Sequence, residues 1–398
     1  MVAIISSCSQ HNDREYVSPN DFKTGSQTVR IAAAIKYAEN NGRKVVIPAI
    51  DKVTNAKIWK IDSAIMLPSD FTLILDNSTI KLSDQCRDNF IRTANLKVGQ
   101  STIEPFRNIH IIGIGNALLE GADNPRASGD CFKQLSLTDS SFNYSYGTDE
   151  GKEGVNQFGG WLNHGINIVE TTGFSIENIT LRDYHGHGII VARSSRGIMR
   201  GITFDARGYI FINKKRYLIK NQDGFGIRQG CHDIIIENCT GNTGDDYLMI
   251  GEYFNDDASF STGRENTISP CGDNYRGEED DTYNIICRNL YDVDASHWKL
   301  VKLMSSGKQK QYNFIFSDIV TNTDSRISFT KYKIPPGLHT NFVFQNLMGK
   351  IRFVDDGGYI KNSVFRNIQY IGDENILGSI NTKDDGHIIE NVRNIDFK

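Results

Sequence analysis

A short triplet recurs along most of this chain: any residue, then asparagine, then an apolar residue. Its copies are Arg107-Asn108-Ile109, Glu177-Asn178-Ile179, Glu237-Asn238-Cys239, Arg288-Asn289-Leu290, Gln345-Asn346-Leu347, Arg366-Asn367-Ile368 and Arg393-Asn394-Ile395. Gly201 and Asp318 fill the asparagine position in two further copies. Asparagine, glycine and aspartate tolerate the left-handed backbone conformation, and asparagine amides can stack on one another from coil to coil. We therefore predict that this position is the tight corner in each coil of a solenoid.

Short apolar segments separated by turn residues indicate that the coils are built from strands. Residues 65–68, 71–75 and 78–82 are three such segments, and 36 glycines with only 8 prolines suit many short strands joined by turns. Strands that repeat once per coil of a solenoid lie parallel to one another, so we predict a single-stranded parallel β-helix. Because solenoids often use several hundred residues as one unit, we predict that it is one domain.

The N-terminal region predicts one helix. Apolar residues between Thr28 and Asn40 follow a helical stripe, and 44–48 then reads as a strand. A helix here would cover the open end of the first coil, which otherwise exposes its edge and core. We place the β-helix domain at 28–398 and treat residues 1–27 as a signal remnant and polar tether.

The seven cysteines are scattered, with no CxxC pair, so they give no case for a zinc site. Cys8 is different, because Ile4-Ile5-Ser6-Ser7-Cys8 is typical of the end of a bacterial lipoprotein signal. The apolar run before it is short and lacks a basic region, so a chance N-terminus is the alternative. The pattern favours a lipid anchor on Cys8 and an exported periplasmic or cell-surface protein.

Charge limits the partners. The formal net charge is −4, and no basic stripe with interleaved aromatic residues occurs, which argues against nucleic acid. No motif predicts a cofactor.

Acidic residues concentrate between Asn221 and Ile250. Asp223 lies in Asn-Gln-Asp-Gly, and Asp245 and Asp246 lie in Gly-Asp-Asp, 22 residues later (245 − 223). When Asp223 is aligned with Asp245, the offset between the two motifs is about the length of one coil, which is ~20–29 residues. Three carboxylates on adjacent strands would repel one another, which raises at least one pKa and leaves a proton donor beside ionised bases. Acid–base hydrolysis needs this arrangement, whereas the alternative is ordinary turn chemistry.

These two motifs and their spacing resemble the signature of the polygalacturonase-type glycoside hydrolases of family 28. The resemblance implies a right-handed parallel β-helix of the pectate-lyase-like superfamily, with a short N-terminal capping helix. It also implies an inverting hydrolase in which Asp245 is the general acid, while Asp223 and Asp246 hold and activate water.

Two family motifs are altered. A Gly-His-Gly is expected one coil after the acidic pair, but SFSTGRENTISP stands there, and Arg-x-Lys is replaced by Leu300-Val301-Lys302. Lys302 is therefore the expected contact to a substrate anion. A plain galacturonide is a less favoured substrate than another, possibly uronic-acid-containing, polysaccharide of plant or algal type.

Other side chains could replace the lost ones. His185 and His187 are candidates for the histidine, with ordinary corner histidines as the alternative. His297 is a weaker candidate, and His232 is expected to have a packing or turn role. Arg228 and Arg264 could supply the guanidinium.

Two insertions interrupt the repeat, and both are expected to flank the active groove. The first, near 131–165, carries Trp161 as a candidate sugar platform, or as a residue that only pins its own loop. The second, near 253–283, is acidic. Its carboxylates could bind calcium, although a solvated acidic loop is the commoner case.

The sequence thus favours a glycoside hydrolase acting on a carbohydrate. Two alternatives stay open: a polysaccharide lyase on the same fold, and a non-catalytic glycan-binding surface protein whose site has decayed.

Overall fold

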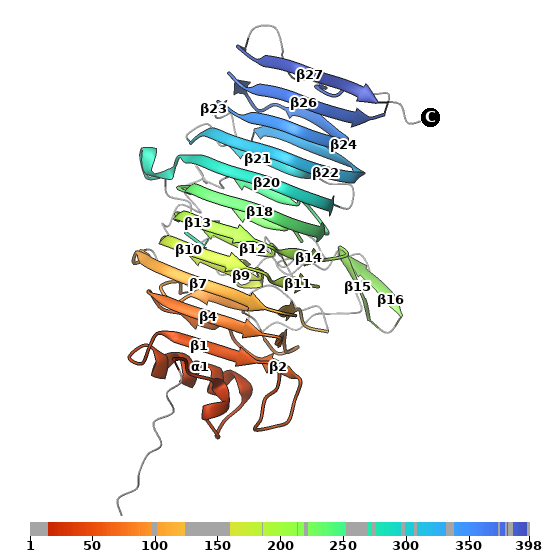
Figure 1. Ribbon diagram of the computed structural model, residues 1–398. Coiled ribbons are helices and arrows are strands. Elements are labelled where there is room, and N and C mark those ends of the chain that lie inside the picture. The colour runs from red at the N-terminus through yellow and green to blue at the C-terminus, as the bar shows by residue number, and fades with distance from the viewer. Residues whose placement is uncertain are drawn as a thin grey trace, which may run out of the picture.

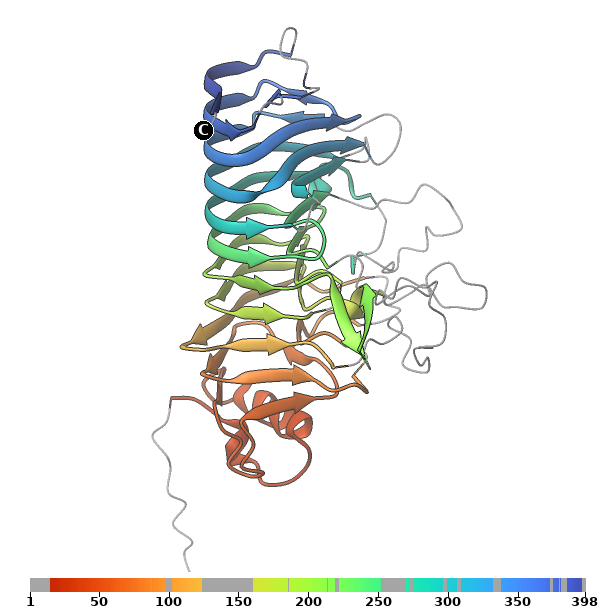
Figure 2. The same ribbon diagram turned by 90° about the vertical axis from the view of Figure 1, so that its right-hand side faces the viewer.

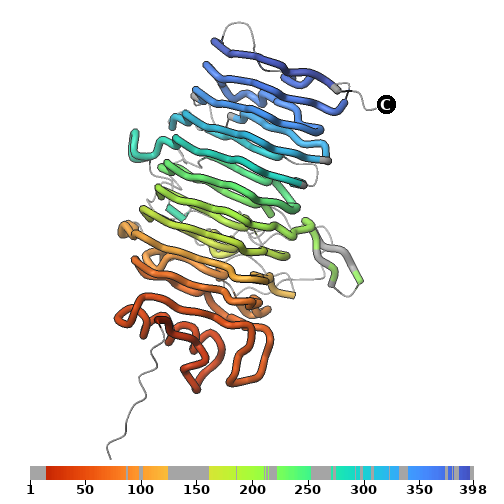
Figure 3. Tube along the Cα trace, viewed as in Figure 1, coloured from red at the N-terminus to blue at the C-terminus, as the bar shows by residue number. Residues whose placement is uncertain are grey.

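The protein is a parallel β-helix capped by one helix, as predicted (Figure 1). The computed structural model describes residues 15–86, 88–97, 102–123, 160–184, 186–212, 214–218, 222–251, 270–271, 275–295, 299–305, 309–331, 338–372, 375–378, 380 and 385–395. Each coil lies on the preceding one, from the capping helix to the last strand (Figure 3). Within these residues, no helix is long and apolar enough to cross a membrane.

The strands stack in three parallel columns. The first contains β1 (Lys44–Pro48), β4 (Phe71–Asp76), β7 (Phe106–Ile114), β10 (Thr171–Glu177), β13 (Ser195–Arg200), β18 (His232–Asn242), β20 (Thr282–Asp294), β22 (Lys310–Lys331), β24 (Val343–Asp356), β26 (Val364–Ile371) and β27 (Ile388–Ile395). The second contains β2 (Ile58–Ile61), β5 (Thr79–Leu82), β8 (Leu118–Glu120), β11 (Thr180–Arg182) and β14 (Thr203–Asp205). The third contains β3 (Ile65–Leu67), β6 (Ile91–Thr93), β9 (Ile166–Val169), β12 (Ile189–Ala192), β17 (Phe225–Ile227), β19 (Leu248–Gly251) and β21 (Lys299–Ser305).

Toward the C-terminus, β22 and β24 are long enough to pass from the first column into the third. The short strands β23 (Leu338–Thr340) and β25 (Ile360–Lys361) pair along the start of the first column. The hairpin of β15 (Tyr209–Ile212) and β16 (Lys215–Leu218) is antiparallel and stands off the coils in Figure 1, whereas in Figure 2 it faces the viewer. No sequence signal predicts it.

The interior is filled by equivalent apolar residues of successive coils. In the third column one such row is fully or almost fully buried: Ile65, Ile91, Ile166, Ile189, Phe225, Leu248 and Val301. Because side chains alternate between the two faces of a strand, the residues between these point outward and form the outer face of the column.

The predicted asparagine ladder exists, and its polar links are direct. Asn391 Nδ2 donates to Asn367 Oδ1 at 2.9 Å, and Asn367 Nδ2 donates to Asn346 Oδ1 at 3.1 Å. Asn178, Asn238, Asn289, Asp318 and Asn346 all have positive φ, as the corner prediction requires.

Two members of the predicted ladder were misassigned. The last corner is Asn391 and not Asn394, because Val392 pairs with Ile368 and so puts Asn391 beside Asn367. Asn108 belongs to a second ladder at the opposite end of the first column, where its Nδ2 donates to Asp70 Oδ1 at 2.7 Å. The triplet alone cannot distinguish the two corners, since both need a left-handed residue.

The cap begins earlier than predicted. Val17 pairs with Val45 of β1, and a 3-10 turn (η1, Pro19–Asp21) follows before helix α1 (Gln27–Ala38). Val17 N donates to Lys44 O at 3.0 Å, Val46 N donates to Val17 O at 2.9 Å, and Asn20 Nδ2 donates to Ile50 O at 2.9 Å, so part of the predicted tether contacts the first coil.

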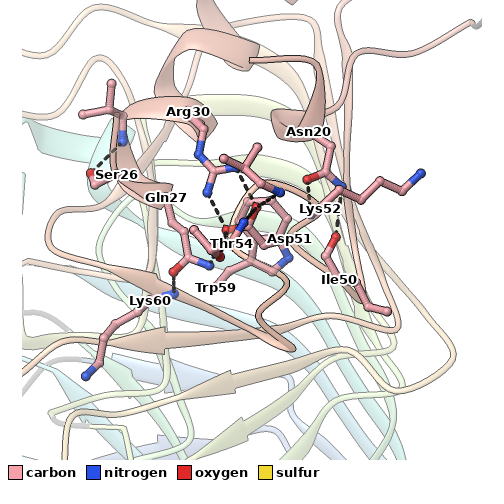
Figure 4. A network of polar contacts seen from close by, with 12 residues as sticks. Asn20, Ser26, Gln27, Arg30, Ile50, Asp51, Lys52, Thr54, Trp59 and Lys60 are labelled. Carbon is pink, nitrogen blue, oxygen red and sulfur yellow. Dashed lines mark hydrogen bonds and ion pairs between the residues drawn. The ribbon is translucent and has the colours of Figure 1, made fainter. Parts of the chain in front are cut away.

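A buried ion pair ties the cap to the loop after β1 (Figure 4). Arg30 of α1 contacts both carboxylate oxygens of Asp51, and both side chains are fully buried. The guanidinium also lies over the ring of Trp59, whose Nε1 donates to Pro48 O at 2.7 Å. This direct contact with the Arg30 guanidinium, together with hydrogen bonds from neighbouring groups, holds the pKa of Asp51 well below its ordinary value.

Candidate active site

The residues that precede the third-column strands line up from coil to coil. Ile189 pairs with Phe225, and Phe225 pairs with Leu248. Counting two residues back from each strand position places His187, Asp223 and Asp246 in one row. The three side chains therefore lie on neighbouring coils at the same edge of the column.

This register corrects the motif alignment. The pairing of Phe225 with Leu248 makes the offset 23 residues (248 − 225), so Asp223 lies beside Asp246 and not beside Asp245. Backbone bonds agree, because Gly224 N donates to Asp246 O at 2.9 Å. Asp245 lies in the turn before Asp246, so its carboxyl approaches the Asp223–Asp246 pair from beside the row.

The turn that holds Asp245 is fixed by backbone bonds to the previous coil. The amides of Gly244 and Asp245 both donate to Gln222 O, at 3.0 and 3.1 Å. Thr243 Oγ1 donates to Asp245 O at 2.7 Å, and Asp246 N donates to Asp245 Oδ1 at 3.0 Å. The Gln222 side chain also donates to Tyr184 O at 2.6 Å. Gln222 therefore links the coil before it to the coil after it, a role that no sequence signal predicts.

The next coil brings cationic and amide donors to Asp246. Lys302 Nζ lies 3.4 Å from Asp246 Oδ2, and the backbone N–H of Lys299 donates to Asp246 Oδ1 at 3.0 Å. The Lys302 side chain is 29% exposed, whereas that of Asp246 is 4% exposed. Lys302 is therefore the member of this pair that solvent or a substrate can reach. Leu300, at the place of the lost arginine, is fully buried.

On the other side of Asp223, the preceding coil contributes His187. His187 Nδ1 lies 2.8 Å from Asp223 Oδ2, and its Nε2 lies 2.9 Å from Arg228 Nη2. Arg228 is fully buried, and its Nη1 lies 2.6 Å from Met249 Sδ. The guanidinium thus packs behind the histidine, so Arg228 does not offer the exposed substrate contact that was expected of it.

Burial raises the pKa values of all three carboxyls. It raises the pKa of Asp245 to about 8, assisted by the charges of Asp223 and Asp246. It raises the pKa of Asp223 to about 7 and that of Asp246 to about 6, in both cases against the opposing charge of Lys302. Asp245 is thus the preferred proton carrier and Asp246 the preferred anion. Since the groups interact, their titration belongs to the cluster and not to single residues.

The same burial keeps His187 neutral. Desolvation, with the charges of Arg228 and Lys302, lowers the pKa of His187 well below its ordinary value. At neutral pH the imidazole therefore carries one ring proton.

The remaining predicted residues fall elsewhere. Trp161 is fully buried against the Arg92 guanidinium, 5.6 Å from its ring centroid, in a cluster with Leu96 and Val169. With no ring face exposed it pins its own segment, so the sugar-platform interpretation is wrong for this conformation. His185 lies outside the described residues.

Several other predictions cannot be located in the structure. Cys8, Arg264, His297 and most of both insertions also lie outside the part of the chain that is described.

The described end of the acidic insertion makes ion pairs. Asp280 is fully buried and accepts from Arg193 Nε at 2.7 Å and Nη2 at 3.1 Å. His232 stacks on Tyr283 on the first column, away from the acids, as a packing role predicts. Among the described residues, no group of three or more His, Cys, Asp or Glu side chains is arranged to hold a metal ion.

Comparisons with known proteins identify the fold. No protein-family model and no curated protein sequence matches the chain. A family 28 exopolygalacturonase of Yersinia enterocolitica is similar in structure, with a TM-score of 0.52 and 14% identity over 95% of this chain and 76% of that one. PfbA, a surface adhesin of Streptococcus pneumoniae, also has a TM-score of 0.52, with 12% identity over 96% of this chain and 90% of that one. The chain therefore shares the β-helix fold of polygalacturonases, a fold that also serves in an adhesin.

Proposed function

We propose that the protein is an inverting glycoside hydrolase that acts on a plant- or algal-type polysaccharide or oligosaccharide. The observation that carries this proposal is the Asp245 carboxyl, which is only partly buried and has its pKa raised to about 8 beside two further carboxyls. A carboxyl that keeps its proton at neutral pH can donate it to a glycosidic oxygen.

The proposed step is a single displacement. Asp245 gives its proton to the glycosidic oxygen as the bond to the anomeric carbon breaks. A water held by Asp223 and Asp246 attacks that carbon from the opposite face and loses a proton to one of these carboxylates. The products are two sugar hydroxyls. The charge of the cluster is unchanged, and its starting protonation returns when the proton passes from the base carboxyl to Asp245.

Lys302 supports an acidic substrate. Its ammonium is partly exposed at the edge of the acid cluster, where it could meet a sugar carboxylate while it also contacts Asp246. Without the usual arginine beside it, we expect weaker selection for a uronate than a guanidinium fork would give.

A panel of pectic, algal and neutral polysaccharides and oligosaccharides tests the proposal. Purified protein should release reducing ends from at least one acidic member. Proton NMR of the first product should show the anomer of inverted configuration. Retention, or an unsaturated product that absorbs in the ultraviolet, would reject this mechanism, and the latter would favour a lyase.

A non-catalytic glycan-binding role is the second candidate. The equal structural similarity to the PfbA adhesin supports it. Saturable glycan binding without any product, under conditions in which the fold is intact, would favour this role over hydrolysis.

We further propose export with a lipid anchor on Cys8. This rests on the Ser6-Ser7-Cys8 pattern alone. Radiolabelled palmitate should enter the protein in a bacterial host and should be lost in Cys8→Ser, while label that persists in the variant would reject the anchor.

A further inference from the structure

A buried row of three polar side chains leads from the interior of the site to a proposed reacting carboxyl. It consists of Arg228, His187 and Asp223. Arg228 Nη2 lies 2.9 Å from His187 Nε2, and His187 Nδ1 lies 2.8 Å from Asp223 Oδ2. Arg228 is fully buried, while His187 is 3% and Asp223 5% exposed. Each contact is therefore made in a low-dielectric environment, where hydrogen bonds are strong.

The chemistry of these groups fixes the positions of the protons. A guanidinium has donors and no acceptor, so the His187 Nε2 facing it must present a lone pair. A neutral imidazole carries one proton, which must then be on Nδ1. Nδ1 then carries its proton 2.8 Å from Asp223 Oδ2, in a geometry too bent for a hydrogen bond, so a proton on this oxygen would meet the Nδ1–H.

Gly226 lies beside the guanidinium and the imidazole. A Cβ on Gly226 would clash with Ile190 Cδ1 at 2.3 Å, but would lie at ordinary contact distances of 3.4 Å from Arg228 Nη2 and 3.5 Å from His187 Nδ1. Glycine here therefore makes room for Ile190, which packs beside these two groups. The backbone N–H of Arg228 is bound to Val191 O at 2.8 Å, which fixes the base of the side chain.

We propose that Arg228 is a positioning residue that locks His187 in its Nδ1–H tautomer and thereby disfavours a proton on the neighbouring Asp223 Oδ2. Arg228 touches no reacting atom in this arrangement. Its effect on catalysis, which rests on the proposed hydrolase function, comes through the imidazole and through the positive charge that it places near Asp223. Asp223 is held ready to take the proton of the attacking water.

Other titratable groups surround Arg228, His187 and Asp223, and a change of charge among these three residues would also affect them. Asp245 and Asp246 approach Asp223 from the next coil, and Lys302 lies one coil beyond. His164, on the coil before, accepts the backbone N–H of His187 at its Nδ1, 3.1 Å away. Variants that change Arg228 alone leave these neighbours in place, so they isolate the contribution of the guanidinium.

The tautomer can be measured without any substrate. In protein labelled with ¹⁵N-histidine, long-range ¹H–¹⁵N correlations show which ring nitrogen carries the proton, and His187→Gln assigns the signal by its loss. We expect Nδ1–H in the wild type at pH 7. We expect the same in Arg228→Gln, whose amide still donates, and a loss of Nδ1–H preference in Arg228→Met. Arg200→Gln, which removes an exposed guanidinium paired with Glu177, is the matched control and should change nothing.

A wild-type ring protonated at Nε2, or at both nitrogens, would overturn the proposal even if the methionine variant does not fold. The activity test is separate. The acid limb of the kcat/KM profile should move up by about one pH unit in Arg228→Met, a roughly tenfold loss on the acid side. Arg228→Gln should shift it less. If the tautomer is as expected but no glycan is cleaved by the wild type, the lock stands and the hydrolase proposal fails.

Discussion

Two carboxyl groups, Asp51 in the cap and Asp223 in the candidate site, are both buried near an arginine. Arg30 contacts both oxygens of Asp51 directly, and the pKa of Asp51 lies well below its ordinary value. Arg228 is separated from Asp223 by the His187 ring, and the pKa of Asp223 rises to about 7. Similar residue types thus give opposite protonation preferences.

The difference shows that the pKa of a buried carboxyl depends on whether the arginine contacts it directly or is separated from it by an imidazole. Bidentate pairing compensates a buried carboxylate and favours its charged form. The neutral imidazole makes no hydrogen bond to Asp223 and keeps the guanidinium at a distance, so desolvation dominates. The cap uses its pair for structure, whereas the site keeps carboxyls that can exchange protons near neutral pH.

The largest expected effect comes from removing the proton that burial keeps on Asp245. Asp245→Asn should lower kcat on a cleaved glycan by about 10²–10⁴-fold, because the leaving oxygen then departs without its acid. Release of reducing ends measures this loss. Asp318→Asn is the control, since asparagine fills that corner in neighbouring coils, and turnover should not change. Unchanged turnover in Asp245→Asn would remove Asp245 from the mechanism.

Breaking the cap pair comes next. Arg30→Met should lower the free energy of unfolding by about 3–5 kcal/mol, because Asp51 remains buried without its partner. Urea denaturation at pH 7 measures the change. The double variant Arg30→Met/Asp51→Leu should recover most of the loss, since it removes both charges. A double variant as unstable as the single one would show that packing over Trp59, and not the charge, is lost.

Much of the fold could be predicted from sequence because solenoid corners repeat. The left-handed residues at Asn178, Asn238 and Asn289 marked the coils, and the helix of the cap followed from its apolar stripe. What failed was the exact register at the site. Matching aspartate to aspartate gave an offset of 22, but the turn at Asp245 takes up one more residue, so the structural offset is 23. Sequence cannot show which of two adjacent acids lies in the turn.

The acids were predictable as a group, but their neighbours were not. Arg228 and Trp161 were expected to meet substrate because their types suit that role. Both are buried by partners distant in sequence, Arg228 by His187 and Trp161 by Arg92. Exposure depends on which coils become neighbours, and only the register determines that.

The opposite pKa shifts predict opposite pH limits on stability. Asp51 stabilises the native state above its ordinary pKa, and this contribution is lost as pH falls below about 4. Asp245 has a raised pKa, so the native state binds more protons than the unfolded chain up to about pH 8, and stability falls as pH rises.

Between pH 6.5 and 8, unfolding in urea should therefore show wild type losing up to ~1.4 kcal/mol per pH unit relative to Asp245→Asn. The comparison with the variant cancels groups that do not interact with Asp245, whereas Asp223 and Asp246 do interact with it, so the difference reports the whole cluster. Parallel pH curves for the two proteins would mean that Asp245 titrates as an ordinary exposed carboxyl.

The smallest effect should come from Lys302, the partly exposed cation beside Asp246. Lys302→Met removes a charge that lowers the pKa of Asp246, so the acid limb of kcat/KM should move to higher pH. An ion pair of this exposure contributes ~0.2–1 kcal/mol, which corresponds to at most about 0.7 pH unit.

If Lys302 also binds a sugar carboxylate, KM should rise for acidic oligosaccharides and stay constant for neutral ones. Lys60→Met, on the exposed face of β2, is the control. A KM that rises equally for both substrate classes would mean that Lys302 shapes the groove and does not recognise the carboxylate of the substrate.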